Sequence, residues 1–280
     1  MRPIPNLTAN LSIKPIHLMI PVLAVLVGLA GCTSTSSNTP APAPIPQPVP
    51  PPPIKEAPLP VRANLRAELA AGYYERGQMD VALQELTEAV KLDPTNAKIY
   101  NVYGLVYATL GQDADAARNF RKALELSPND SEFRQNWGWY LCTHAQAKES
   151  IPEFERAISN PLYKTPEIAL INAGRCAGSL GETQRAEQFF RRALNVSPSN
   201  PEAAYSLSQL AYKEGRLPEA RALMKPVMQQ NNPSAEELVL GMCIERKLGD
   251  RSAEASYVSQ LRNRYPNSPE TKSIATGACE

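Results

Sequence analysis

The sequence predicts an all-α fold, a solenoid of six consecutive helix pairs, and three observations lead to this prediction. Residues 62–280 are rich in alanine, leucine, glutamate and arginine, which are strong helix formers. Prolines recur in this stretch with a period of about 34 residues, as Pro94 and Pro128 show. Pro198 and Pro266 are separated by two such periods. A glycine near the middle of most periods then marks the turn between two helices.

The segment before this fold, residues 1–31, has the pattern of an export signal. Arg2 and Lys14 precede a mostly apolar stretch at residues 16–30, which is the order of charged and apolar regions in such signals. This stretch is shorter than the about 20 residues that a helix needs to cross a bilayer. We therefore expect the segment to be removed rather than kept as an anchor.

The end of the apolar stretch, LAGC at residues 29–32, resembles the lipobox of bacterial lipoproteins. The resemblance implies that Cys32 is acylated on its thiol, and on its amine after cleavage before it. More than one acyl chain anchors a protein stably. Thr33 stands where an inner-membrane retention signal usually has aspartate, so the resemblance implies the outer membrane. The alternatives are an ordinary secretory signal with a chance cysteine and a buried apolar helix in which Cys32 only packs.

Residues 32–61 are predicted to be a linker that follows the lipid. Between Pro40 and Pro60, 11 of 21 residues are proline, which disfavours helices and sheets and favours extended polyproline II. At about 3.1 Å per residue, such a segment spans roughly 65 Å. We expect a semi-rigid spacer, with a proline-rich ligand for another protein as the alternative.

Within each later period, small and bulky residues recur at fixed places. The second unit has Gly104 on its first helix and Phe120 on its second, and the fourth unit has Gly174 and Phe190 there. Small residues let two helices approach closely, and bulky residues fill the space between neighbours. The pattern resembles the tetratricopeptide repeat, which implies a right-handed superhelical α-solenoid.

Six such units and a C-terminal tail account for residues 62–280. The third unit has Ala145 in place of the turn glycine and two extra residues at its end, so its second helix is expected to be irregular. The sixth has Glu254 between two alanines, which leaves its register uncertain by one residue. The approximate bounds of the units are 63–96, 97–130, 131–166, 167–200, 201–234 and 235–268.

The first helices of such units line a concave groove, which is the candidate partner site. Residues two apart on a helix point about 200° apart, so Trp137 should pack inside while Trp139 faces the groove. Aromatic and amide side chains together suit an extended peptide or a partner helix. Solvated surface or packing between units is the alternative for each single residue. The groove stripe predicted in this way consists of Tyr74, Lys98, Asn101, Leu105, Gln135, Trp139, Arg175, Tyr205, Gln209 and Tyr212.

Four cysteines remain once Cys32 is assigned to lipid, an even number for an oxidising compartment. Four cysteines allow three pairings. Cys142 and Cys176 lie one period apart on the first helices of consecutive units, which pack side by side, so we predict that they are bridged. Cys243 and Cys279 are then the second candidate pair, tying the tail to the last unit. Four buried free thiols are the alternative.

The sequence lacks the motifs that enzymatic chemistry requires. His144 is the only histidine after residue 31, and metal-binding, phosphate-binding and catalytic-triad motifs are missing. The formal net charge is +1 without a long basic tract, which argues against nucleic acid as a partner. We expect no catalysis, no metal, no cofactor and no small-molecule substrate.

The lipobox, the linker and the six units together resemble the PilF/PilW family, the pilotins of type IV pilus machines. The segment NWGWYLC at residues 136–142 is the most specific part of the match. The resemblance implies a non-catalytic adaptor at the periplasmic face of the outer membrane. Such an adaptor binds the secretin subunit, brings it to the outer membrane and promotes its multimerisation.

Two other functions fit parts of the sequence. A periplasmic repeat lipoprotein that serves β-barrel assembly or peptidoglycan synthases would share the anchor and the repeats. An envelope hydrolase with accessory repeats would need a catalytic domain, for which residues 62–280 leave no stretch.

Overall fold

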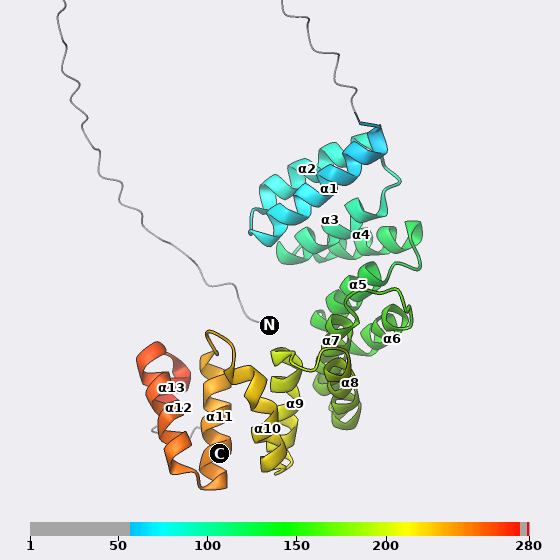
Figure 1. The fold of residues 1–280 in the computed structure, drawn as a ribbon. Coiled ribbons are helices and arrows are strands. Elements are labelled where there is room, and N and C mark those ends of the chain that lie inside the picture. The colour runs from blue at the N-terminus through cyan, green and yellow to red at the C-terminus, as the bar shows by residue number, and fades with distance from the viewer. Residues whose placement is uncertain (1–56, 275–278, 280) are drawn as a thin grey trace, which may run out of the picture. The chain divides into compact units, whose positions relative to one another are not determined.

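The computed structural model describes residues 57–274 and residue 279. All regular elements among these residues are helices, which follow one another from blue to red in Figure 1. This agrees with the predicted all-α solenoid. The helices are α1 (Leu59–Glu75), α2 (Met79–Leu92), α3 (Ala97–Thr109), α4 (Asp113–Leu126), α5 (Ser131–Thr143), α6 (Ala147–Ile158), α7 (Pro166–Ser179), α8 (Thr183–Val196), α9 (Pro201–Lys213), α10 (Leu217–Met228), α11 (Ala235–Leu248), α12 (Arg251–Arg264) and α13 (Pro269–Ser273).

The boundary between linker and repeats differs slightly from the prediction. The export signal, Cys32 and residues 32–56 of the linker lie outside the described residues. The first helix, α1, begins at Leu59, before the predicted boundary at residue 62. Pro60 is tolerated there because the first turn of a helix leaves its N–H groups without intrahelical partners.

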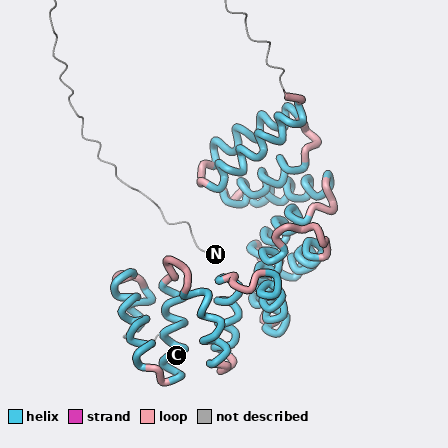
Figure 2. Tube along the Cα trace, viewed as in Figure 1, coloured by secondary structure: helices cyan, strands magenta, loops and turns pink. Residues whose placement is uncertain are grey.

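Consecutive helices pack as pairs, joined by short loops (Figure 2). Each odd-numbered helix from α1 to α11 packs on the even-numbered helix that follows it, which makes six units. Each second helix from α2 to α10 also contacts the first helix of the next unit. Successive first helices contact one another as well, from α1 with α3 to α9 with α11. The first helices therefore share one face, as the groove prediction requires.

Close approach within a unit depends on a small residue of the first helix that faces a ring of the second. A Cβ built on Gly104 would lie 2.6 Å from Phe120, and one on Gly174 would lie 2.6 Å from Phe190. Real Cβ atoms do not come this close to other atoms, so these positions require glycine at this helix separation. The four glycine–ring pairs of the described residues are Gly104–Phe120, Gly138–Phe154, Gly174–Phe190 and Gly241–Tyr257.

The turn within the third unit corrects one expectation. Five units turn at a glycine with positive φ, such as Gly111 at 70°. In the third unit, Ala145 takes the same left-handed conformation with φ of 59°. The irregular second helix expected there is wrong: α6 is continuous from Ala147 to Ile158, with Pro152 inside it. The two extra residues are accommodated after α6, in the longer connection to α7.

The sixth unit shows the uncertainty in register that its sequence indicated. Gly241 faces Tyr257. Gly241 lies one residue earlier in the sixth unit than Gly104 lies in the second unit. Its turn glycine, Gly249, keeps the regular place, so α11 gains one residue between the close contact and the turn. The inner contact and the turn therefore follow alignments that differ by one residue.

Polar caps explain where three of the first helices, α3, α5 and α9, begin. Asn96, Asp130 and Asn200 each come two residues after a proline and accept a hydrogen bond from a backbone N–H of the next helix. Such a cap satisfies one of the four N–H groups that a helix start leaves unpaired. The proline ends one unit, and the cap starts the next.

Candidate partner-binding site

Three residues of the predicted groove stripe line one cleft of about 660 Å³. Arg175 comes from α7, and Tyr205 and Gln209 come from α9. Residues of α8, among them Gln184, complete the wall. The cleft therefore lies between the helices of the fourth unit and the first helix of the fifth.

Gly178 explains why this place is hollow. It lines the cleft on α7, and a Cβ built on it would meet only Ala186, at an ordinary distance of 3.9 Å. The residue one period later, in the same place on α9, is Tyr212. A glycine where the next unit has a large ring leaves space that a partner side chain can fill.

The cleft mixes polar and apolar groups, and its charged lining residues are Arg175, Lys213 and Glu214. The Arg175 guanidinium lies 2.5 Å from a carboxylate oxygen of Glu202, and both side chains are about half exposed. Lys213 is exposed and forms no ion pair with the residues that the structure describes. Thr183 and Gln184 add a hydroxyl and an amide. Together with the Tyr205 ring, these groups suit an extended peptide that carries charged and polar side chains.

Other stripe residues are used within the chain. Lys98 pairs with Glu68 of the first unit at 3.0 Å. Leu105 and Trp139 pack beside the buried cluster around Phe120. The remaining two, which are both partly buried, are Tyr74 and Gln135.

Asn101 and Tyr212 differ from the expected exposed groove positions. Asn101 is only 2% exposed, and Asn136 on α5 donates a hydrogen bond to its side-chain oxygen at 3.1 Å. It joins two units instead of facing a partner. Tyr212 donates its hydroxyl to the backbone carbonyl of Cys279 at 3.1 Å. The groove prediction missed both contacts because each depends on a residue from a distant part of the chain.

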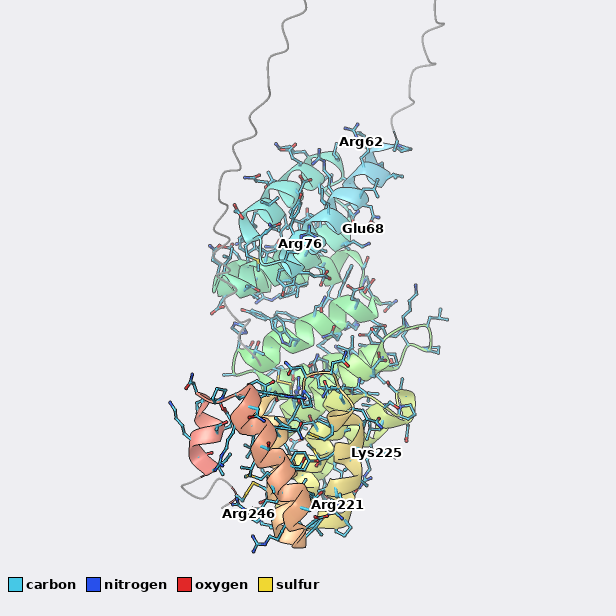
Figure 3. All side chains as sticks on the ribbon, turned by 60° about the vertical axis from the view of Figure 1, so that its left-hand side comes forward. Arg62, Glu68, Arg76, Arg221, Lys225 and Arg246 are labelled. Atoms are coloured by element: carbon cyan, nitrogen blue, oxygen red, sulfur yellow. A yellow bond between two sulfur atoms is a disulfide. The ribbon has the colours of Figure 1, made fainter. Side chains whose placement is uncertain are left out.

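One exposed apolar surface on α1 was not predicted. Val61, Leu65 and Leu69 lie four residues apart and are 48%, 55% and 44% exposed. Arg62 and Glu68 lie on the same helix, and Arg76 directly follows its end (Figure 3). In the second unit, the residue one period after Leu65 is Ile99, which is fully buried. The alignment of the repeats indicates this exposure, because the equivalent residue in the second unit is covered by the first unit, and α1 has no preceding unit among the described residues.

The structure joins the cysteines in the expected pairs. Cys142 and Cys176 form a disulfide with Cα atoms 5.9 Å apart, which fastens α5 to α7. Cys243 and Cys279 form another with Cα atoms 5.3 Å apart. Both separations are ordinary for disulfides. Cys32, the expected lipid site, lies outside the described residues.

The residues that the structure describes contain neither a candidate metal site nor a helix that could span a membrane. Within residues 57–274 and 279, no group of three acidic, histidine or cysteine side chains could hold a metal ion. In the same residues, no helix combines the length and the apolar character that a bilayer crossing needs.

Comparison with known proteins assigns the repeats to the tetratricopeptide class. Three models of the tetratricopeptide repeat match residues 72–111, 97–130 and 179–238. None of these models describes an enzyme. The type IV pilus assembly protein PilF of Pseudomonas aeruginosa is 27% identical over 203 residues, which cover 72% of this chain and 81% of PilF.

Solved structures give the same assignment. A structure of PilF from Pseudomonas aeruginosa has a TM-score of 0.73 and 25% identity, covering 78% of this chain and 98% of that one. PilW, described as a widely conserved type IV pilus biogenesis factor, has a TM-score of 0.69 and 30% identity, covering 76% of this chain and 98% of PilW. The chain therefore belongs to the PilF/PilW family of type IV pilus biogenesis proteins.

Proposed function

We propose that the protein is a pilotin, an outer-membrane lipoprotein that binds the secretin subunit of a type IV pilus machine and promotes its localisation and multimerisation. The observation that carries the proposal is the relationship to PilF and PilW across nearly the whole length of their solved structures. Tetratricopeptide units bind other proteins, and the function is that of a non-catalytic adaptor.

The anchor and the linker give the adaptor its mechanism. Acylated Cys32 restricts the protein to the periplasmic face of the outer membrane. The proline-rich linker sets the distance from the membrane at which the repeats capture a subunit. Restriction to a surface raises the effective concentration of captured subunits and so favours their multimerisation.

The cleft between the fourth unit and α9 is the proposed contact for a segment of the secretin subunit. Its side chains stand on helices held by packing, so the backbone positions from which they reach a partner are set in advance. Arg175 and Lys213 attract acidic side chains, while Tyr205 offers a ring for apolar contact. The α1 surface offers a second, apolar contact in the first unit.

Deletion of the gene tests the function directly. The amounts of secretin monomer and heat-resistant multimer are measured in separated inner and outer membranes. We expect multimers to vanish from the outer membrane, and a Cys32→Ala chain to support assembly only at the wrong membrane. Secretin multimers that are unchanged in amount and place would refute the proposal and favour a scaffold for β-barrel assembly or peptidoglycan synthases.

A variant that fills the cleft tests the contact. Gly178→Tyr places a ring where the structure leaves space, and Lys148→Tyr places the same ring at an exposed position on α6. We expect the first variant to reduce secretin binding roughly tenfold or more, as blocked central contacts do, and the second to leave it unchanged. Equal binding by both variants, with both folded by circular dichroism, would exclude the cleft.

A further inference from the structure

The first helix of the last unit, α11, is covered more fully than its position explains. Nine of its residues are buried, against seven on α7, which has the same length. A helix in the last unit should be less covered, because no following unit among the described residues packs beside it. Something other than a repeat therefore covers α11.

The cover is the tail, which is here the described residues 269–274 and 279. Its helix α13 packs on α11 and α12, as Figure 1 shows in red and orange. Ile274 and Cys279 pack against the apolar cluster of the sixth unit, and the disulfide to Cys243 fixes Cys279 on α11. The buried members of that cluster are Ala235, Leu238, Met242, Cys243 and Leu261.

The tail also reaches the fifth unit, which distinguishes it from a simple cap. A cap that only closes the end of a solenoid contacts its last helices. Cys279 instead accepts a hydrogen bond from Tyr212 on α9, at 3.1 Å. The Nζ of Lys247 lies 4.4 Å from the centre of the Tyr212 ring and holds the ring from α11. The tail thus lies on the face shared by the first helices α9 and α11.

Tyr212 belongs to the predicted groove stripe, and its contact with the tail is the kind that a bound peptide makes. A side-chain hydroxyl donates to a backbone carbonyl, while the tail side chains of Ile274 and Cys279 pack on an apolar surface. We propose that the tail is a built-in occupant of the partner groove. It covers the groove stripe at Tyr212 and excludes a partner segment there, leaving the cleft beside Arg175 as the open part. The assignment of the groove to a partner rests on the proposed function.

Hydrogen exchange of the full chain tests where the tail lies. Cys279→Ser removes its covalent attachment, and we expect amides of α9 and α11 to exchange roughly tenfold faster because both helices lose cover. A Cys142→Ser, Cys176→Ser chain is the control, in which α5 and α7 respond instead. Faster exchange in α11, α12 and α13 with α9 unchanged would show a simple end cap and overturn the proposal.

A milder variant keeps the test valid if loss of the disulfide disturbs folding. Tyr212→Phe removes only the hydroxyl that holds the Cys279 carbonyl, and the packing of the ring is kept. We expect faster exchange in residues 269–274 of this variant. Unchanged exchange there would show that α9 does not hold the tail, against the proposal.

Binding of the purified periplasmic part of the secretin tests the exclusion. We expect Cys279→Ser to bind it roughly tenfold more tightly than the unaltered chain, because the partner no longer competes with a tethered segment. Measurable but equal affinities would refute exclusion. If no form binds the secretin, the proposed function fails, and the exchange pattern still decides whether the tail lies on α9.

Discussion

Two junctions between units are built from different chemistry. The ring junction joins α4 to α5, where the Phe120 ring lies 5.9 Å from Trp137 and 5.4 Å from Tyr140, between ring centres. Arg121 lies over the Trp137 ring at 5.7 Å. Aromatic pairs in such tilted arrangements add about 0.5–1.5 kcal/mol each beyond the burial of their area.

The charged junction joins α8 to α10 and to Arg216, the residue just before α10. Arg191 lies 2.6 Å from Glu219, and Arg216 lies 2.9 Å from Glu187, so each side of the junction supplies both signs of charge. These side chains are one fifth to one half exposed, so salt weakens their attraction. One repeat pattern therefore accommodates two kinds of junction, because the repeated spacing fixes only the contacts inside a unit.

The largest expected difference comes from the same ring position in two units. Phe120→Ala and Phe190→Ala each remove a buried ring that covers a glycine, which costs about 3–5 kcal/mol of unfolding free energy. Phe120 also contacts two rings across its junction, so its loss should cost about 1–2 kcal/mol more. Urea denaturation of both variants measures the difference. Equal losses would mean that the rings across the junction add nothing.

Removing the disulfide between the third and fourth units is expected to rank next. Its cysteines are separated by 34 positions in the sequence, for which the chain-entropy model gives about 3–4 kcal/mol. Cys142→Ser with Cys176→Ser should lower the urea midpoint accordingly, with the ring junction still folded by tryptophan fluorescence. The unfolded, unreduced natural chain should also show no free thiol among these cysteines in an Ellman titration. Four free thiols would contradict both bridges.

The features that the sequence predicted are those that repeat, and the features it missed depend on neighbours. Gly104 and Phe120 follow the period, and so do the turn glycines, because each unit must solve the same packing problem. Asn101 is buried because α5 supplies Asn136, which no pattern within the unit reveals. Leu65 is exposed because α1 has no preceding unit among the described residues. Tyr212 meets the distant tail only through folding of the chain.

A smaller effect separates the junctions by their response to salt. Glu187→Gln removes the charge that Arg191 and Arg216 share, and should cost about 1 kcal/mol at low salt. In about 0.5 M NaCl most of the stability difference between the natural chain and this variant should disappear, because screening weakens exposed pairs. Gln135→Glu, at a half-buried position outside the network, is the control. A cost that is unchanged by salt would mean that Glu187 acts through packing.

The smallest expected effect is a contrast in pH dependence. Burial opposes ionisation of Glu219, but hydrogen bonds from Arg191 and Arg216 outweigh it and hold its carboxyl pKa below the usual 4.5. The hydrogen bond from Arg246 lowers the pKa of Glu254 in the same direction. A lowered folded pKa gives stability that is present above pH 4.5 and is lost as the pH falls through the folded value.

The ring junction has the opposite dependence. Burial raises the pKa of the Tyr140 hydroxyl above its usual 10, helped by the nearby Asp113 carboxylate. This stability is present below pH 10 and is lost as the pH rises through the folded value. Both tryptophans of the chain, Trp137 and Trp139, lie on α5, so their fluorescence reports the surroundings of α5, including this junction, while circular dichroism reports all helices. From pH 7 to pH 4, the urea midpoint by circular dichroism should fall more than the midpoint by fluorescence, and above pH 10 the order should reverse. Coincident midpoints at every pH would mean that the repeats unfold as one cooperative unit, in which neither junction yields before the other.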